Sequence, residues 1–185
     1  MALSPYRVAP VPHALGRAFV ASHHYAGGAP NTSVFCHGLL LNEELVGVAL
    51  WLPPTRVAAE SVTGGRGSDA WRGVLALSRL AVAPSVPKNG ASFLIGRSIR
   101  LIRQEPRWHT LLTYADTAQG HTGAIYRATN WTYLGTTAPG RRWATPDGRQ
   151  VTGKSTRNRT KAEMLALGYR QLPPSVKHKY VMVLR

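Results

Sequence analysis

Residues 114–131, YADTAQGHTGAIYRATNW, end an apolar segment with a carboxylate and place a phenol ten residues later. A side chain that follows a strand lies where ligands bind in α/β sheets, and Asp116 there can accept a proton from an amine or anchor one. The hydroxyl of Tyr126, on the helix expected next, can donate a proton to a leaving group. Gly120 and Gly123 let the backbone pass close to a ligand. The alternatives are a turn or cap role for Asp116 and a core position for Tyr126.

A second candidate is the junction SRLAVAPSVPKNGAS (78–92), where a strand ends and a helix begins near Asn89. Asn is a favoured N-cap residue, and the first backbone N–H groups of a helix have no intrahelical partner. With a lysine nearby, such a helix start can bind an anion such as phosphate. The alternative is an ordinary capped helix. The candidate cofactor-binding residues are Lys88, Asn89, Gly90, Ala91 and Ser92.

The third candidate is the sequence His23-His24-Tyr25. Adjacent histidines point in different directions, so they rarely bind one metal ion together. The chain has no HExxH, no CxxC and no clustered carboxylates, and we therefore assign no metal ligand. The alternative is an iron site in which one of these histidines joins Asp116 and His121. We expect instead that a histidine and a tyrosine of this segment hold a polar substrate.

The charge of the chain is strongly positive, because 23 Lys and Arg against 8 Asp and Glu give +15 and a pI near 11.1. Residues 141–185 hold 11 of these Lys and Arg against Asp147 and Glu163. Such a surface is attracted to polyphosphate, so nucleic acid is the expected partner and a merely solvated surface is the alternative. The expected DNA contacts, in a basic part spanning residues 139–185, are Arg141, Arg142, Lys154, Arg157, Arg159 and Lys161.

Length and composition suit one folded domain. The chain has 185 residues, of which 44% are hydrophobic and 17% are charged, enough for one sizeable core. No apolar run approaches the roughly 20 residues of a membrane helix, and the start MALSPYRVAPVPH lacks the basic-then-apolar order of a signal peptide. Cys36 is the lone cysteine. An internal disulfide is therefore excluded, and a reducing cytoplasm is the expected location.

The hydrophobic pattern predicts a mixed α/β single domain. Strands are expected at 73–84, 110–115, 131–136 and 178–184 and as a pair within 34–52 around a turn at Asn42–Glu43, helices at 13–24, 91–103 and about 122–129, and connections at 23–33 and 53–73. In helix 91–103 the apolar residues share one side and Arg97, Arg100 and Arg103 share the other. We expect these arginines to form a solvated face, with phosphate contact as the alternative.

The order of these elements resembles the GNAT fold of acyl-CoA-dependent N-acyltransferases, with a mixed central sheet and helices on both faces. IYRATNWTYLG (125–135) is similar to the Tyr-x-x-x-Gly-Phe segment of that family, with Asn130 and Trp131 in the places of the Gly and the Phe. The resemblance implies that Tyr126 protonates a departing thiolate. It also implies an acetyl-CoA-like donor at residues 87–92, where the family's Arg/Gln-x-x-Gly-x-Gly/Ala loop departs from its pattern at Pro87.

The chain resembles more closely the Mom family of phage DNA-modification proteins, a divergent branch of that fold. The resemblance lies in SRLAVAPSVPKNGASFLIGRSIRLIR, YADTAQGHTGAIYRATNWTYLG, HHYAG and KHKYVMVL, which span nearly the whole chain in the same order. It implies a phage enzyme that converts adenine N6 in DNA to the N6-carbamoylmethyl form and protects phage DNA from host restriction. The site residues that it implies are His24, Tyr25, Arg79, Ser92, Asp116 and Tyr126.

The implied roles follow from the chemistry of N6, a poor nucleophile whose lone pair is delocalised into the ring. Asp116 is the candidate base, and Tyr126 is the acid. Arg79 would anchor the donor or neutralise developing negative charge, and Ser92 would hydrogen-bond the donor. His24 with the adjacent tyrosine would hold the base or the donor. Because N6 lies inside the duplex, the target adenine must be single-stranded or flipped out.

Two other functions fit parts of the sequence. An ordinary N-acyltransferase that uses acyl-CoA on a small amine or a protein terminus fits the fold, but it leaves the charge of +15 unexplained. A DNA-binding protein without enzymatic activity explains the charge, but it gives the Asp116–Tyr126 stretch no purpose. Nucleoside analysis of DNA from cells that express the protein would distinguish these readings.

Overall fold

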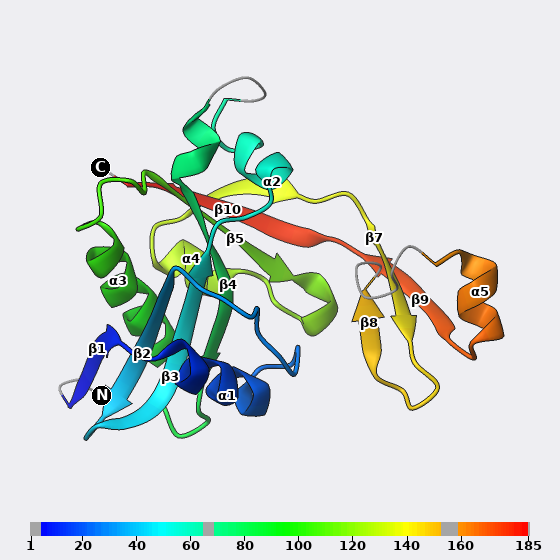
Figure 1. Ribbon diagram of the computed structural model, residues 1–185, viewed down its shortest axis with the longest axis horizontal. Coiled ribbons are helices and arrows are strands. Elements are labelled where there is room, and N and C mark those ends of the chain that lie inside the picture. The colour runs from blue at the N-terminus through cyan, green and yellow to red at the C-terminus, as the bar shows by residue number, and fades with distance from the viewer. Residues whose placement is uncertain (1–4, 65–68, 153–158, 185) are drawn as a thin grey trace. The chain divides into compact units, whose positions relative to one another are not determined.

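The structure, a computed structural model, describes residues 5–64, 69–152 and 159–184 (Figure 1). Helices and strands are interspersed along the chain, as in a mixed α/β protein. Their order is β1 (Tyr6–Pro10), α1 (His13–His23), β2 (Phe35–Leu41), β3 (Glu44–Leu52), α2 (Arg56–Glu60), η1 (Asp69–Gly73), β4 (Val74–Val82), α3 (Gly90–Ile102), β5 (Thr110–Asp116), η2 (Thr117–Gln119), α4 (Ala124–Ala128), β6 (Thr132–Thr136), β7 (Gly140–Ala144), β8 (Gln150–Thr152), α5 (Lys161–Ala166), β9 (Arg170–Ser175) and β10 (Lys177–Val183).

The larger of the two sheets has seven strands in the order β1-β2-β3-β4-β5-β10-β6, and the smaller has the order β8-β7-β9. β1 to β4 pair antiparallel in chain order, whereas β4 and β5 pair parallel. This mixed sheet with its helices confirms the predicted fold class. The predicted turn between β2 and β3 is also confirmed, because Asn42 and Glu43 have φ of 48° and 68°, as a two-residue type I′ turn requires.

The chain divides into two compact units. The first consists of Met1–Thr113, Ala124–Tyr133 and Tyr180–Arg185, and the second consists of Tyr114–Gly123 and Leu134–Lys179. The first unit contains β1 to β4 and the four helices α1 to α4. The second contains the small sheet β8-β7-β9 and α5.

In the first unit, α1 and α3 cover opposite faces of β2 and β3. Successive side chains of a strand point to opposite faces, so Cys36 and His37 of β2 face different helices. A Cβ atom on Gly16 of α1 would lie 2.3 Å from the Cys36 Sγ atom, which shows how closely α1 packs on one face. On the other face, Ser98 of α3 contacts His37. The core of this unit therefore fills both sides of the sheet.

A buried polar group ties α3 to the sheet. The Ser98 Oγ atom accepts a hydrogen bond from Trp51 Nε1 (2.7 Å) and lies 2.5 Å from His37 Nδ1. All three residues are almost fully buried. Burial lowers the pKa of His37 from 6.5 to about 4, because the charged imidazolium loses its hydration there.

Three parts of the chain differ from the sequence-based expectation. β1 was not predicted, and the expected connection 53–73 contains the short helices α2 and η1. The basic stretch after β6, for which no elements were predicted, forms β7, β8, α5 and β9. These elements escaped prediction because each has only three to six residues, too few to show a hydrophobic period.

Candidate active site

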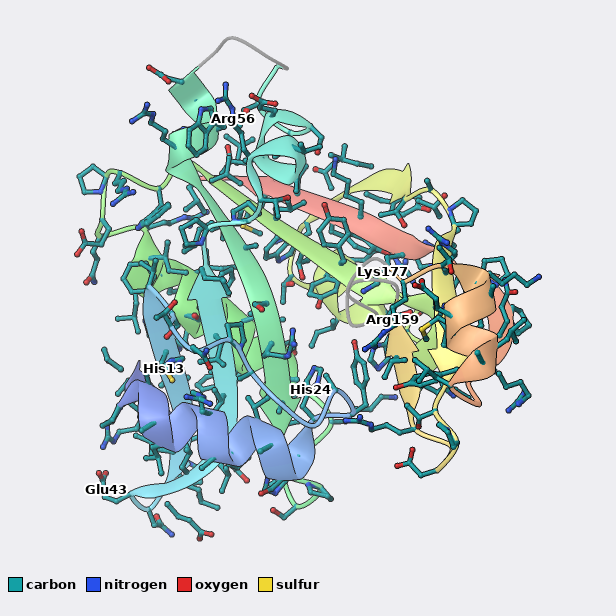
Figure 2. All side chains as sticks on the ribbon, turned by 45° about the vertical axis from the view of Figure 1, so that its right-hand side comes forward. His13, His24, Glu43, Arg56, Arg159 and Lys177 are labelled. Carbon is teal, nitrogen blue, oxygen red and sulfur yellow. The ribbon has the colours of Figure 1, made fainter. Side chains whose placement is uncertain are left out.

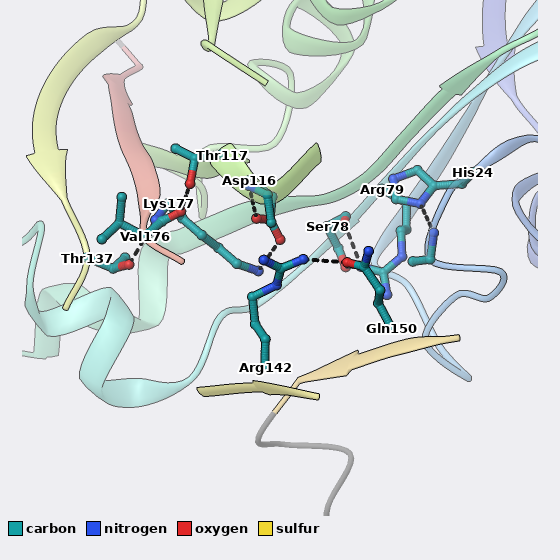
Figure 3. Close-up of polar contacts among 12 residues, drawn as sticks. His24, Ser78, Arg79, Asp116, Thr117, Thr137, Arg142, Gln150, Val176 and Lys177 are labelled. Atoms are coloured by element: carbon teal, nitrogen blue, oxygen red, sulfur yellow. Dashed lines mark hydrogen bonds and ion pairs between the residues drawn. The ribbon is translucent and has the colours of Figure 1, made fainter. Parts of the chain in front are cut away.

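In the first unit, Arg79 lies on β4 beside a β-bulge. The pairing of β4 with β3 shifts register here and leaves Ser78 as the extra residue. Bulges re-aim side chains and are frequent beside active sites. The Arg79 Nη1 atom donates to the Ser78 carbonyl oxygen (2.8 Å), and Nε donates to the Gly28 carbonyl oxygen (2.9 Å). The half-buried guanidinium is thereby fixed between β4 and the loop that follows α1 (Figure 3).

The His24–Tyr25 segment begins that loop, directly after α1 (Figure 2). The His24 Nδ1 atom accepts a hydrogen bond from the backbone N–H of Ala26 (3.1 Å), so a neutral His24 carries its proton on Nε2. Its ring stacks on the Tyr25 ring at a centroid distance of 4.3 Å. The same loop reaches the Gly28 carbonyl that holds Arg79. The structure therefore ties three of the predicted residues to one short loop.

Tyr126 lies on α4, which ends in a Schellman motif. The N–H of Trp131 donates to the Tyr126 carbonyl oxygen (3.0 Å), and the N–H of Asn130 donates to that of Arg127 (3.2 Å). Asn130 has φ of 64°, the left-handed conformation that this motif requires and that Asn tolerates better than other residues with a side chain. The Tyr126 and Trp131 rings meet edge to face at 5.7 Å. The Tyr-x-x-x-Asn-Trp spacing is thus the spacing of a helix end.

The Tyr126 phenol is buried, with 8% of the residue exposed. Burial raises its pKa above the ordinary value of 10, and the nearby phenols of Tyr25 and Tyr180 raise it further, while a hydrogen bond with the Thr113 side chain opposes them. The phenol therefore keeps its proton at neutral pH. Electrostatic contact with Tyr25 also links Tyr126 to the loop after α1.

At the start of α3, the preceding turn packs tightly against Gly90. The N–H of Gly90 donates to the Pro87 carbonyl oxygen (2.7 Å). A Cβ atom at Gly90 would lie 2.1 Å from Val86 Cγ1, so the glycine is needed for the turn to fold back on itself. The Gly90 N–H therefore already has an acceptor within the chain, whereas the prediction for this residue expected it to be available to a phosphate.

The rest of the helix start fits a smaller anion site. Asn89 is the N-cap residue, but its side chain makes no capping hydrogen bond. Its carbonyl oxygen accepts a hydrogen bond from Ser92 Oγ (2.8 Å). The N–H groups of Ala91 and Ser92 lie in the first turn, where no intrahelical acceptor exists, and the exposed Lys88 precedes them. These groups fit one phosphate of a donor.

In the second unit, Asp116 is buried and uses both carboxylate oxygens. Oδ1 accepts a hydrogen bond from the N–H of Ala118 (3.0 Å), and Oδ2 lies 3.4 Å from Lys177 Nζ (Figure 3). Thr117 fixes the neighbouring chain, because its hydroxyl donates to the Val176 carbonyl oxygen (2.7 Å). The turn role that the sequence left open for Asp116 is therefore present, and an ion pair accompanies it.

The predicted DNA contacts in the second unit differ in their surroundings. Arg141, Arg159 and Lys161 are exposed, and Figure 2 labels Arg159. Arg142 instead links the strands of the small sheet, because it donates hydrogen bonds to Gln150 Oε1 of β8 and to a β9 carbonyl oxygen. The other two predicted contacts, Lys154 and Arg157, lie outside the described residues.

Within residues 5–64, 69–152 and 159–184, no three His, Cys, Asp or Glu side chains are grouped so that they could hold a metal ion. Within the same residues no helix is long and apolar enough to cross a membrane.

Sequence reasoning did not find Ser78, Thr113 or Lys177 as contacts of the predicted residues. Ser78 is part of the quoted SRL segment, but only the β-bulge singles it out. Lys177 opens the last strand, far in sequence from Asp116, and only the adjacency of β5 and β10 brings it close. Thr113 has a sequence signal: it is a polar residue in the apolar run of β5.

Comparison with solved structures shows the fold of the GNAT N-acetyltransferases. An agmatine N-acetyltransferase is similar with a TM-score of 0.57 and 12% identity, covering 97% of this chain and 100% of that one. A Salmonella typhimurium protein solved with acetyl-CoA is similar with a TM-score of 0.57 and 12% identity, covering 98% of this chain and 95% of that one.

Comparison of sequences shows the family. The Mom protein family matches residues 5–185, and the chain belongs to this family. Methylcarbamoylase mom of Escherichia phage Mu is 28% identical over 128 residues, which are 65% of this chain and 50% of that protein. The match thus spans about half the length of this curated relative.

Proposed function

We propose that this protein is a DNA-modification enzyme that transfers a carbamoylmethyl group to N6 of adenine in DNA and so protects phage DNA from restriction. N6 forms a bond to the methylene carbon of an activated donor, and the leaving group departs with the electron pair of the broken bond. One proton leaves N6, and one proton joins the leaving group. The adenine is single-stranded or flipped out during the reaction.

The family match over residues 5–185 carries this proposal. The phage Mu relative is named a methylcarbamoylase, which supports the transferred group. The net charge of +15 supports a polyanionic substrate. The charge is dense in the second unit, where Tyr114–Gly123 and Leu134–Lys179 together hold 10 Lys and Arg against 3 Asp and Glu.

Asp116 takes the proton from N6 in this proposal. The Ala118 N–H fixes one carboxylate oxygen, and Lys177 pairs with the other. An amine that approaches Oδ2 must therefore displace the ammonium or share the oxygen with it. Since 43% of the Lys177 side chain is exposed, water can solvate the displaced ammonium, while the incoming amine takes its place at the buried carboxylate.

Tyr126 protonates the leaving group, because burial keeps its phenol neutral. Arg79 stabilises the negative charge that develops on the donor. Its Nε and Nη1 atoms are held by carbonyl oxygens, so the guanidinium is oriented before the donor binds. His24 and Tyr25 belong to the loop whose Gly28 carbonyl oxygen holds Arg79, and they orient the donor or the base.

The donor has an activated carbamoylmethyl group, and a phosphate-bearing donor related to acyl-CoA fits the start of α3. Lys88 and the N–H groups of Ala91 and Ser92 would hold one phosphate. The Ser92 hydroxyl, which donates to the Asn89 carbonyl oxygen, retains lone pairs and can still accept a hydrogen bond from the donor.

The test is mass spectrometry of nucleosides from the DNA of cells that express the protein. A deoxyadenosine with an added carbamoylmethyl group is expected. Asp116→Asn should abolish the modification and leave DNA binding intact, whereas Asp147→Asn makes the same charge change at an exposed turn and should retain activity. Unmodified DNA from cells that express the wild-type protein would refute the proposal. Modified DNA from cells that express the Asp116→Asn variant would exclude that residue as the base.

A small-amine or protein N-acyltransferase is the second candidate. The anion site at the start of α3 favours it, since an acyl-CoA phosphate fits there as well. The same experiment separates the two functions, because acylated amines with unmodified DNA support only the second.

A further inference from the structure

A groove of about 580 Å³ opens on the first unit, between α3, the turn after α4 and the end of β10. Figure 1 shows the end of β10, marked by the chain terminus, near the C-terminal end of α3. The groove residues that matter here are Gly96, Arg100, Arg103, Asn130, Met182 and Val183. Those from α3 and its C-cap lie beyond the first turn of the helix, so the groove is separate from the donor site proposed at the start of that helix.

Two arginines give the groove its charge. Arg100 lies in the last turn of α3, Arg103 is the C-cap residue of this helix, and both are exposed. Among the described residues neither of them takes part in an ion pair. Beside them, Met182 and the 65% exposed Val183 add an apolar wall. Guanidinium groups next to an apolar surface suit a phosphate attached to a sugar or a base.

Asn130 adds an amide to the same groove at a position where glycine would fit the backbone best. Its φ of 64° is a conformation that glycine adopts without strain. The side chain is exposed and lines the groove. The protein therefore keeps a hydrogen-bonding side chain where its own folding would favour none.

At Gly96, by contrast, the side chain is missing although the surrounding structure would accept one. Glycine inside a helix lowers its stability relative to alanine, so packing usually explains its presence. A Cβ atom at Gly96 would meet no atom within 4 Å outside its own helix. Packing in this protein therefore does not require the glycine. The missing side chain keeps the groove open for a ligand that lies close to α3.

We infer that this groove binds the phosphodiester backbone of DNA, with Arg100 and Arg103 on two neighbouring phosphates and Asn130 on an adjacent oxygen. The inference rests on DNA being the substrate, as in the proposed function. It assigns a contact surface that the basic second unit does not contain. The groove would hold the strand beside the target nucleotide, where sequence-independent contacts position the polymer.

The salt dependence of binding tests the inference. Each phosphate contact on single-stranded DNA changes the slope of log K against log salt by about 0.7. The double variant R100Q/R103Q should therefore have a slope less negative by about 1.4, and at 0.1 M salt its affinity should fall by about 25-fold. The control R17Q/R72Q removes the same net charge from exposed positions elsewhere in the first unit, and its slope should stay at the wild-type value. Fluorescence anisotropy with a labelled oligonucleotide measures both.

Two variants test the groove without removing charge. Asn130→Gly keeps the backbone conformation and removes the amide, and Gly96→Gln fills the groove from a helical position. Neither should lower the thermal unfolding temperature, and both should weaken oligonucleotide binding several-fold. Wild-type affinity in both variants, or an R100Q/R103Q slope equal to that of the control, would overturn the inference.

Inorganic phosphate and AMP test whether the groove binds the backbone of DNA or a free phosphate compound. If the groove serves free phosphates, millimolar AMP or phosphate should raise the unfolding temperature of the wild type but not of R100Q/R103Q, and the DNA slope should not change. That result would also overturn the inference. Because DNA binding is read without any modified adenine, a failure of the proposed reaction remains distinguishable from a failure of the groove.

Discussion

His37 is expected to make the protein lose stability in mild acid. Its imidazole is 2% exposed and its Nδ1 atom lies 2.5 Å from Ser98 Oγ, the same oxygen that accepts the Trp51 N–H. Trp51 in turn stacks on Trp131 at 6.4 Å, and Trp131 packs against the ring of Tyr126. Protonation of His37 therefore acts on a buried chain of contacts that ends at the proposed catalytic phenol.

The direction follows from the pKa of His37, which burial lowers from 6.5 to about 4. The unfolded chain binds this proton more tightly, so stability is complete above pH 6.5 and falls as the pH is lowered towards 4. At about 1.4 kcal/mol for each pKa unit, the full difference is about 3 kcal/mol. Of this, about 2.5 kcal/mol is lost between pH 7 and pH 4.5. A loss of that size is a large fraction of the roughly 5–15 kcal/mol that stabilises a typical domain.

Urea unfolding followed by tryptophan fluorescence, from pH 7 to pH 4.5, measures the effect. His37→Asn retains a polar atom near Ser98 and should be about 1–3 kcal/mol less stable at pH 7. Its stability should nevertheless depend much less on pH in this window. His23→Gln, at an exposed position of α1, should keep the wild-type dependence. If the wild type and His37→Asn lose stability in parallel, burial of His37 does not cause the acid sensitivity.

Three substitutions follow from other contacts. Lys177→Gln frees one oxygen of Asp116 and should retain measurable adenine modification in the nucleoside assay; complete loss would make the ammonium itself essential. Tyr126→Phe preserves the ring contacts and should keep the unfolding midpoint while lowering the rate of modification about 100-fold or more; an unchanged rate would exclude the phenol as the acid. Gly16→Ala places a Cβ atom 2.3 Å from Cys36 Sγ and should destabilise the fold by about 1–3 kcal/mol in urea; unchanged stability would mean that α1 shifts freely.

The sequence predicted the elements whose apolar residues follow a regular period. α1, α3 and the strands β2 to β5 were expected within a few residues of their observed bounds, because each buries a continuous face. The second unit was not predicted, since its strands are short and mostly polar. α5 carried a usable signal, because Thr160 and Glu163 form the capping box expected of a Thr-x-x-Glu start.

The candidate site was predictable to the extent that neighbours in sequence form it. The Tyr126-x-x-x-Asn130-Trp131 spacing is local, and the Schellman motif that it forms follows from the residue types. The partners of Asp116 and Arg79 depend on strand order and on a bulge, which no local pattern encodes. The assignment of catalytic roles to these residues stays a prediction.

Burial determines which proposed catalytic group gives a proton and which takes one. The raised pKa of Tyr126 keeps its phenol protonated at physiological pH, and a neutral phenol is a poor base. In the proposed reaction, the proton that N6 loses must therefore go to another group. Asp116 is the only carboxylate among the proposed catalytic residues, and its oxygens already act as acceptors, one for the Ala118 N–H and one for Lys177. A phenol that must donate and a carboxylate that can only accept give the transfer its direction before any donor is identified.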